Sequence, residues 1–565
     1  MSKNDLEIAR SIPLRPLTEV ARVLGLTPDD LEPYGNAKAK VKLDMLKQPA
    51  TRKPGKYVVV TAISPTPLGE GKTVHTVGIS QALNRIGKRT VCVIRQPSMG
   101  PVFGIKGGAA GGGYSQVVPP EEMNLHLTGD FHAVTSAHNL CAAFLDAHIF
   151  HGNEPKFDPA RITWRRVFDM NDRALRTVQV AMGGDKNGTP RETGFDITSA
   201  SEIMAILGLA KDIHDLRARL GRIVLGYDVS GKPITAEDLQ AAGAMTAILK
   251  DALKPTLMQT LEGTPALVHT GPFANIAHGN SSIVADYVAL RCADFVVTEA
   301  GFGADMGAEK FFNIKCRASG LKPDAALLVA TVRALKMHSG RFEITAGKPL
   351  PEGLQKEDLD ALAAGVGNLV KQIENVRMHG IPVVVAVNVF PTDTEAEIEF
   401  VRKTAIEAGA FACHVSRLFS EGGKGGEDLA HALVAAAEQP SSFQFLYPAE
   451  ATLKEKIEAL ATKVYGADGV DFEPAAEQAL AQFEACGWGH FPVCMAKTQY
   501  SLSHDPKLKG RPTGYRFRVR DARVAVGAGF VYPLAGEIMT MPGLGKVPGG
   551  AKIDIDQDGN VVGMF

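Results

Sequence analysis

Short runs of apolar residues, many of them β-branched, recur along the chain between longer segments with helical patterns. Within each run the residues are apolar throughout and do not alternate with polar ones. A strand needs this composition when helices cover both faces of its sheet, as in parallel sheets. We therefore expect an α/β fold with a mostly parallel sheet covered by helices. The expected strands are Tyr57–Ile63, Thr90–Arg95, Ala266–His269, Phe295–Thr298, Ala326–Ala330 and Val383–Val389.

Residues 74–89 lie between the first two expected strands and mix apolar with small and polar positions. Gly87 and Lys88 near the end of this segment are typical of a helix C-terminus. Strand, helix and strand then follow one another within about 40 residues, as a βαβ unit requires. The sequence predicts such a unit at the start of the fold.

The chain of 565 residues is longer than one hydrophobic core usually supports. A polar stretch from Pro351 and a change of pattern at Tyr447–Pro448 suggest boundaries. We expect a large domain over residues 1–350, a second α/β domain over 351–447 and an α+β domain over 448–565. The last of these should contain helices to about Ala485 and then short strands.

Charge and composition exclude several classes of protein. With 61 basic and 62 acidic residues, no overall field favours nucleic acid as a partner. The chain starts with a polar segment that lacks the features of a secretory signal, and no apolar stretch reaches the length of a membrane span. Seven scattered cysteines without a C-x-x-C pair favour reduced, buried thiols. We expect a cytoplasmic protein.

The strongest chemical motif follows the first expected strand and precedes the expected helix. Its glycines allow backbone N–H groups to approach phosphate oxygens, Lys72 supplies a positive charge, and the Thr73 hydroxyl can reach a magnesium ion. Thr66 stands where the usual pattern has glycine. The motif predicts a P-loop NTPase-like large domain that binds a nucleotide. It consists of Thr66, Pro67, Leu68, Gly69, Glu70, Gly71, Lys72 and Thr73.

Arg95 ends the second expected strand, at the edge where open α/β sheets place ligands. Its guanidinium could bind a carboxylate or phosphate, or form a salt bridge at the strand end. Six glycines lie in the stretch from Gly104 to Gly113. They indicate a mobile loop or a backbone packed close to a ligand.

Further along, Asp130 follows Gly129 at a turn. It could accept a proton from an attacking amine, hold a substrate amino group, or be a solvated carboxylate. Two loops after expected strands, 299–305 and 388–394, are typical of ligand contacts. Phe390 and Phe419 could be core aromatics or could offer flat faces to a ring.

Taken together, the phosphate loop, residues 95–114, 127–132, 390–394 and 538–544 resemble the formate–tetrahydrofolate ligase family. The resemblance covers nearly the whole chain and keeps the order of the motifs. It implies that ATP, with Mg²⁺, phosphorylates formate, and that N10 of tetrahydrofolate then attacks formyl phosphate. The products would be 10-formyltetrahydrofolate, ADP and phosphate.

The resemblance also implies roles for single residues. Lys72 would steady the transferring phosphoryl group, Thr73 would help hold Mg²⁺, and Arg95 would bind formyl phosphate. Phe302 would line the formyl phosphate pocket within domain 1–350, and Phe390 and Phe419 would sandwich the pterin, so that domain 351–447 contributes folate contacts. Asp130 would guide the folate amine. The family works as a homotetramer activated by a monovalent cation, K⁺ or NH4⁺.

Two positions depart from the family pattern, which has Trp at 419 and Glu at 96, where this chain has Phe419 and Gln96. A smaller ring stacks over less area, and Gln96 removes a charge beside Arg95.

Two other functions use the same motifs. One is a P-loop ligase acting on another carboxylate, and the other is a nucleotide-switch ATPase, which needs segments that sense the γ-phosphate.

Overall fold

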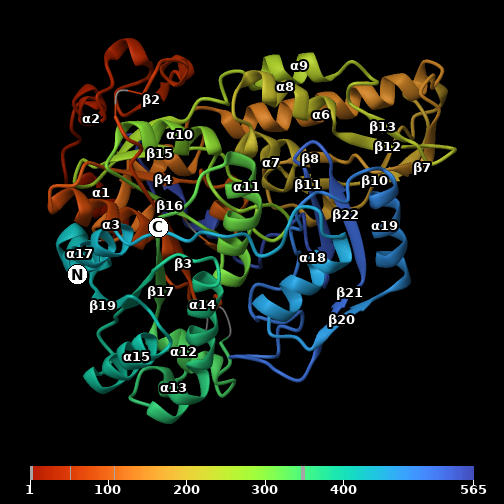
Figure 1. Cartoon of the computed structure of the whole chain (residues 1–565). Coiled ribbons are helices and arrows are strands. Elements are labelled where there is room, and N and C mark those ends of the chain that lie inside the picture. The colour runs from red at the N-terminus through yellow and green to blue at the C-terminus, as the bar shows by residue number, and fades with distance from the viewer. Residues whose placement is uncertain (1–3, 51, 107, 345–349, 565) are drawn as a thin grey trace.

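A single large sheet forms the centre of the molecule (Figure 1). The computed structural model describes residues 4–50, 52–106, 108–344 and 350–564. In spatial order the main strands are β1 (Leu31–Tyr34), β2 (Lys38–Val41), β14 (Thr256–Thr260), β15 (Pro265–Val268), β4 (Thr90–Ile94), β16 (Phe295–Glu299), β3 (Lys56–Ala62), β17 (Ala325–Ala330), β18 (Val383–Asn388) and β19 (Ala412–Ser416). The short strands β5 (Gly111–Gly112) and β6 (Ser115–Val118) join it through β14.

All neighbours from β15 to β19 pair in parallel, and only the edge that contains β1, β2, β14 and β6 is antiparallel. The six strands expected from the sequence are present in this sheet, with ends that shift by about one residue. The predicted mostly parallel α/β architecture is therefore confirmed.

Helices cover both faces of the sheet, which explains why the strands are apolar throughout. On one face, Val58 and Val60 of β3 pack against α3 (Lys72–Arg85) and α17 (Glu427–Ala437). On the other face, Tyr57 and Val59 share a core with a second group of helices. These are α10 (Ile283–Cys292), α12 (Val332–His338), α13 (Leu359–Gly365), α14 (Gly367–Arg377) and α15 (Glu395–Glu407).

The boundary expected near residue 350 does not coincide with a break in the sheet. β18 pairs with β17 through Val383 and Ala326, and β19 then pairs with β18. Residues 351–447 therefore extend the sheet of the preceding residues. Whether they form a separate domain stays a prediction.

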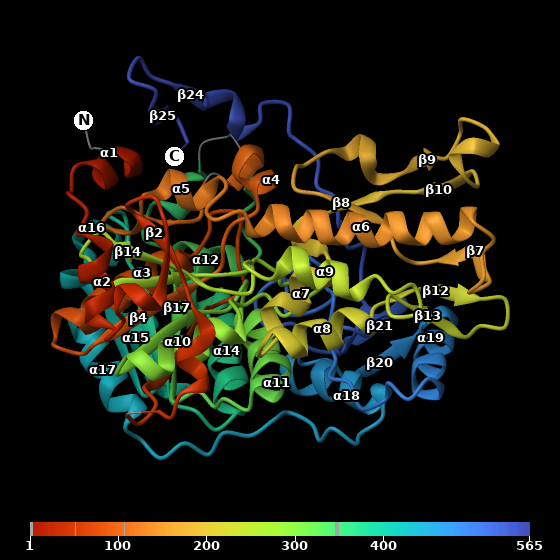
Figure 2. The same cartoon turned by 90° about the horizontal axis from the view of Figure 1, so that it is seen from above.

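A helical layer flanks one end of the sheet and encloses its own core (Figure 2). It consists of α6 (Asp130–Phe150), α7 (Glu202–Leu209), α8 (Ile213–Gly221) and α9 (Ala242–Leu249), next to β12 (Val224–Asp228), which pairs with β7 (Phe157–Ile162) and β13 (Pro233–Thr235). Smaller pairs are β8 (Arg166–Phe168) with β11 (Phe195–Ile197) and β9 (Val178–Val180) with β10 (Arg191–Thr193).

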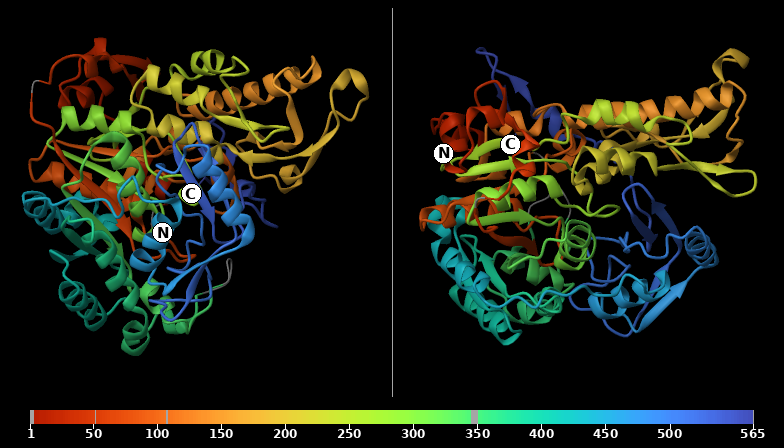
Figure 3. Two further views of the ribbon diagram at one scale, coloured as in Figure 1. Left: turned by 45° about the vertical axis from the view of Figure 1, so that its right-hand side comes forward. Right: turned by 45° about the horizontal axis from the view of Figure 1, so that its top comes forward.

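The chain after residue 448 mixes helices and short strands, as expected, and encloses a further core (Figure 3). Its elements are α18 (Leu453–Ala459), β20 (Gly469–Phe472), α19 (Pro474–Ala485), β21 (Arg516–Val519), β22 (Asp521–Ala525), β23 (Phe530–Leu534), β24 (Asp554–Ile555) and β25 (Val561–Val562). We refer to residues 448–564 as the C-terminal region.

The cysteine side chains agree with the expectation from the sequence. All seven are free thiols, and all except Cys486 are buried. None of the helices in the described ranges is long and apolar enough to cross a membrane.

Candidate active site

The loop between β3 and α3 is held in shape by its own side chains. The buried Glu70 carboxylate accepts hydrogen bonds from the Thr66 backbone N–H (2.8 Å) and hydroxyl (3.0 Å). The Leu68 N–H in turn donates to the Thr66 oxygen (3.3 Å). Thr66 thus ties the loop to Glu70 at the position where the usual motif has glycine. Burial raises the pKa of Glu70.

Two glycines of this loop adopt backbone conformations that other residues avoid. Gly69 has φ 74° and Gly71 has φ 81°, both in the left-handed region. The Gly71 carbonyl accepts a hydrogen bond from His75 Nδ1 (2.8 Å), so that nitrogen carries the proton. Burial lowers the pKa of His75 to about 4, which keeps the ring neutral at pH 7. The loop therefore enters α3 in one fixed conformation.

Lys72 is the first residue of α3, and Thr73 is the second. Lys72 is partly buried, and desolvation lowers the pKa of its ammonium, while the Glu70 and Glu299 carboxylates act in the opposite direction. The N-terminus of a helix also carries partial positive charge. This combination of lysine, helix terminus and glycine-rich loop fits the oxygens of a phosphate chain.

Glu299 connects the phosphate loop to Arg95. It ends β16, which lies between β4 and β3, so its side chain reaches both neighbours. Glu299 Oε2 accepts a hydrogen bond from the Thr73 hydroxyl (3.0 Å), and Oε1 accepts one from Arg95 Nε (3.1 Å). Glu299 is only 4% exposed. The structure thus brings Lys72, Thr73 and Arg95 together at the carboxyl ends of the central parallel strands.

Glu299 has no individual role in the sequence-based prediction, which includes it only in the loop 299–305. A signal was present, because a carboxylate ends an otherwise apolar strand. What the sequence did not contain was the strand order that places β16 beside β3. The hydroxyl of Thr73 and the carboxylate of Glu299 are the hard oxygen ligands that Mg²⁺ prefers.

Gln96 follows Arg95, and its side chain is 2% exposed. Its backbone N–H donates to the Thr270 carbonyl (2.7 Å). Its side-chain Oε1 has no hydrogen-bond partner among the described residues. The position that departs from the family pattern therefore presents a buried neutral acceptor beside Arg95.

Asp130 lies next to β2, which is three strands away from β4, the strand that precedes Arg95. As the first residue of α6, it is 2% exposed and forms an ion pair with the buried Lys40 ammonium at 2.6 Å. Lys40 lies on β2, and three strand spacings of about 4.8 Å separate β2 from β4, roughly 14 Å in all. The Asp130 carboxylate is therefore bound to Lys40, well away from Arg95.

Phe302 lies in the loop after β16, and the residue before it, Gly301, lies close to the guanidinium of Arg95. A Cβ atom added at the preceding Gly301 would lie 3.1 Å from an Arg95 side-chain nitrogen. Phe302 itself has φ 60°, a left-handed conformation that costs about 1–3 kcal/mol in a residue of this kind. Such strain is often found at binding sites. It is consistent with the prediction that Phe302 lines the formyl phosphate pocket.

The two other aromatic candidates belong to different elements, because Phe390 follows β18 and Phe419 lies on a short helix after β19. The Phe390 ring packs under the Arg333 guanidinium, 3.4 Å from the ring centroid. Phe419 is 51% exposed on α16 (Leu418–Glu421), and its carbonyl accepts a hydrogen bond from the Tyr114 N–H (2.9 Å). Among the ring pairs of the described residues, none joins Phe390 to Phe419.

The end of the glycine-rich stretch packs closely against Phe419. A Cβ atom at Gly113 would lie 2.1 Å from the Phe419 carbonyl oxygen, and one at Gly112 would lie 3.1 Å from its ring. Gly113 also has φ 55°. At these residues the glycines allow a close approach of two chain segments, so this part of the stretch is packed in place.

The chain is similar to known proteins over nearly its whole length. The family model described as formate–tetrahydrofolate ligase matches residues 3–565. Proteins named formate–tetrahydrofolate ligase from Saccharopolyspora erythraea and from a Roseiflexus species are each 60% identical to this chain, over 99% of it and over 99% and 100% of their own lengths. The protein of that name from Cutibacterium acnes is 58% identical over the full length of both chains. The chain therefore belongs to the formate–tetrahydrofolate ligase family and is a ligase.

Proposed function

We propose that the protein joins formate to tetrahydrofolate by way of formyl phosphate. An oxygen of formate attacks the γ-phosphorus of ATP and ADP leaves. N10 of tetrahydrofolate then attacks the formyl carbon, loses its proton and displaces phosphate, which gives 10-formyltetrahydrofolate. The observation that carries this proposal is the Glu299 carboxylate, which bridges Thr73 and Arg95. A phosphate held by the loop would lie within reach of the arginine, in a chain that belongs to this family.

Each residue at this edge has a place in the proposal. The loop 66–73 would hold the ATP phosphates in the manner of a P-loop NTPase, and Lys72 would offset the charge that develops during transfer. Arg95 would bind the formyl phosphate anion. Thr73 and Glu299 would hold Mg²⁺, which when bound would neutralise phosphate charge.

The folate substrate is proposed to contact the aromatic side chains. Phe302 would line the formyl phosphate pocket, and Phe390 and Phe419 would hold the pterin. Asp130 would guide the amine while its carboxylate remains ion-paired with Lys40. By the same family resemblance, we propose a cytoplasmic homotetramer activated by K⁺ or NH4⁺.

The test is product formation by the purified protein. We expect 10-formyltetrahydrofolate when formate, MgATP and tetrahydrofolate are mixed, and none when any one of them is left out. Lys72→Ala should lower kcat by at least about 100-fold, because it removes a charge that stabilises the transferring phosphoryl group. Lys88→Ala, beyond the other end of α3, is the matched control and should retain activity.

Other outcomes would favour the alternatives. Turnover of a larger carboxylate without tetrahydrofolate would identify a ligase with another substrate. ATP hydrolysis at one rate, whether or not formate and tetrahydrofolate are present, would identify a nucleotide-switch ATPase. Full activity of Lys72→Ala would contradict the role of the loop.

A further inference from the structure

The loop that carries Phe302 continues into a short helical segment, Ala304–Ala308, whose Asp305 is fully buried. The two carboxylate oxygens of Asp305 have different partners. Oδ1 accepts a hydrogen bond from Gln372 Nε2 at 2.6 Å, and Oδ2 lies 2.7 Å from Lys497 Nζ. The loop after β16 is thus fixed at one residue by α14 and by the C-terminal region.

Gln372 extends this network to the phosphate loop. Its amide nitrogen also donates to the Ser64 hydroxyl at 3.1 Å. Ser64 lies two residues before Thr66, and Asn368, one turn earlier on α14, donates to the same hydroxyl at 3.0 Å. One helix therefore holds both the segment that enters the phosphate loop and the loop that follows Glu299.

The C-terminal region contributes Lys497 to this network, and the Lys497 side chain is fully buried. In addition to the ion pair with Asp305, its ammonium donates hydrogen bonds to the carbonyl oxygens of Ser501 (2.5 Å) and Thr498 (3.1 Å). All three N–H groups of the lysine therefore have a nearby acceptor. Burial lowers the pKa of Lys497, and the Asp305 carboxylate acts in the opposite direction.

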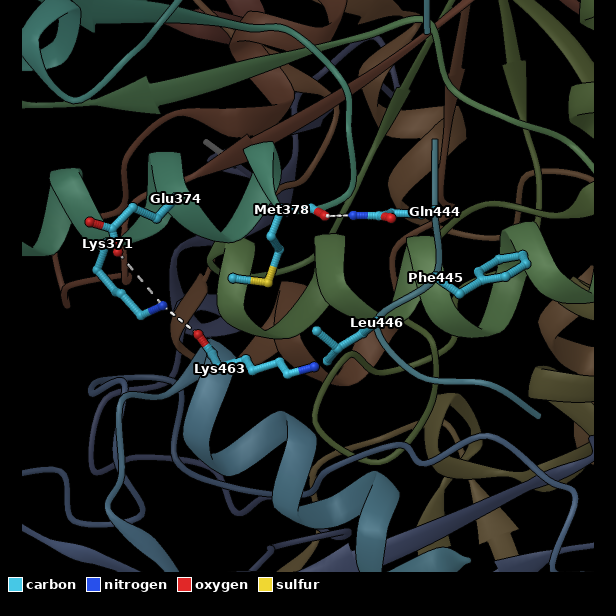
Figure 4. A pocket seen from close by; sticks show the side chains of 7 residues that line it. All are labelled: Lys371, Glu374, Met378, Gln444, Phe445, Leu446 and Lys463. Carbon is cyan, nitrogen blue, oxygen red and sulfur yellow. Dashed lines mark hydrogen bonds and ion pairs between the residues drawn. The ribbon is translucent and has the colours of Figure 1, made fainter. Parts of the chain in front are cut away.

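Two further hydrogen bonds join the C-terminal region to α14. Lys371, next to Gln372, donates to the Lys463 carbonyl at 2.5 Å, on the wall of a shallow pocket between the two segments (Figure 4). Asn368 donates to the Gly510 carbonyl at 3.0 Å. Lys497 thus acts from a region that is firmly attached to α14.

We propose that Lys497 is a positioning residue for the reaction. It holds Asp305, and through Asp305 and Gln372 it fixes the loop of Phe302 relative to the phosphate loop. The C-terminal region thereby helps to set the geometry in which Arg95 and Phe302 meet the acyl phosphate. This inference rests on the proposed function.

The test is Lys497→Met, which keeps much of the volume and removes the charge. A loop shifted by about 1 Å can cost about 100-fold in rate, so we expect a loss of that order in kcat/KM for formate. The affinity for ADP, measured by calorimetry without turnover, should stay near the wild-type value. The bonds of Thr66 to Glu70 shape the nucleotide loop and do not involve Asp305.

Lys315→Met is the matched control. Lys315 is 1% exposed and pairs with the fully buried Asp286 at 2.5 Å, so the two variants each leave one buried carboxylate unpaired. Asp286 also accepts a hydrogen bond from the Tyr57 hydroxyl. Tyr57 is the second residue of β3 and lies near the start of that strand, five residues or about 16 Å from its end. Lys315→Met should lower the thermal midpoint to a similar degree and leave kcat/KM of the folded enzyme unchanged.

A second variant covers the case in which Lys497→Met does not fold. The double variant Asp305→Asn with Lys497→Met leaves no unpaired buried charge, so it should fold, yet kcat/KM for formate should remain reduced. If either folded variant has wild-type kinetic constants for formate, the inference is wrong. If wild-type protein makes no 10-formyltetrahydrofolate, the proposed function itself fails, and the two results are distinguishable.

Discussion

Glu299→Gln tests the contact on which the proposed site depends. The carboxylate accepts one hydrogen bond from Thr73 and one from Arg95. Glutamine can turn its amide oxygen to Arg95 and its amide nitrogen to the Thr73 hydroxyl, which then accepts, but the ionised acceptor that both groups meet in Glu299 is lost. A hydrogen bond to a charged group contributes about 1.5–3 kcal/mol. If the bond persists in the transition state, kcat/KM should fall by about 10- to 150-fold.

The assay is the initial rate of 10-formyltetrahydrofolate formation at several Mg²⁺ concentrations. Binding of Mn²⁺ to the ADP complex, followed by electron paramagnetic resonance, gives a second measurement that does not require turnover. Both the rate and the metal affinity should fall. Glu309→Gln is the control, because this buried glutamate accepts a hydrogen bond from Asn313 and has no bond to Thr73 or Arg95. Wild-type kcat/KM and metal affinity in Glu299→Gln would refute the reasoning.

Two further predictions concern other parts of the molecule. Phe419→Trp enlarges a ring that is 51% exposed, and added stacking of about 0.5–1.5 kcal/mol should lower the Kd for tetrahydrofolate by about 2- to 10-fold. A looser complex in fluorescence titration would contradict the pterin placement. Burial raises the pKa of Glu309 from 4.5 to about 8, so the folded protein binds more protons than the unfolded chain between these values, and stability falls as pH rises through them. Glu309→Gln should therefore raise the free energy of unfolding by about 3 kcal/mol at pH 7 and by little below pH 4, as urea unfolding at both pH values would reveal.

The central part of the fold could be predicted because its signal is local. A strand covered on both faces must be apolar at every position, and Val58, Val59 and Val60 meet that demand within one short segment. The same holds for the phosphate loop, in which two left-handed backbone conformations require glycine at 69 and 71.

The antiparallel edge was not predicted, because its strands carry polar residues and are short. Lys40 on β2 illustrates the difficulty, since a lysine suggests an exposed position, yet it is fully buried against Asp130. The pairing of β17 with β18 across residue 350 and the bridge formed by Glu299 were also missed. Both depend on which strands become neighbours, and this is decided by tertiary packing.

The order of strands in the sheet has a consequence for synthesis of the chain. β3 ends at Ala62, but its two neighbours are β16, which begins at Phe295, and β17, which begins at Ala325. At about 5–20 residues per second, a ribosome needs roughly 12–50 s to make the intervening chain. During that time an apolar strand has neither of its final partners, and such segments tend to aggregate. Production of the protein should therefore depend on chaperones more strongly than its size alone suggests.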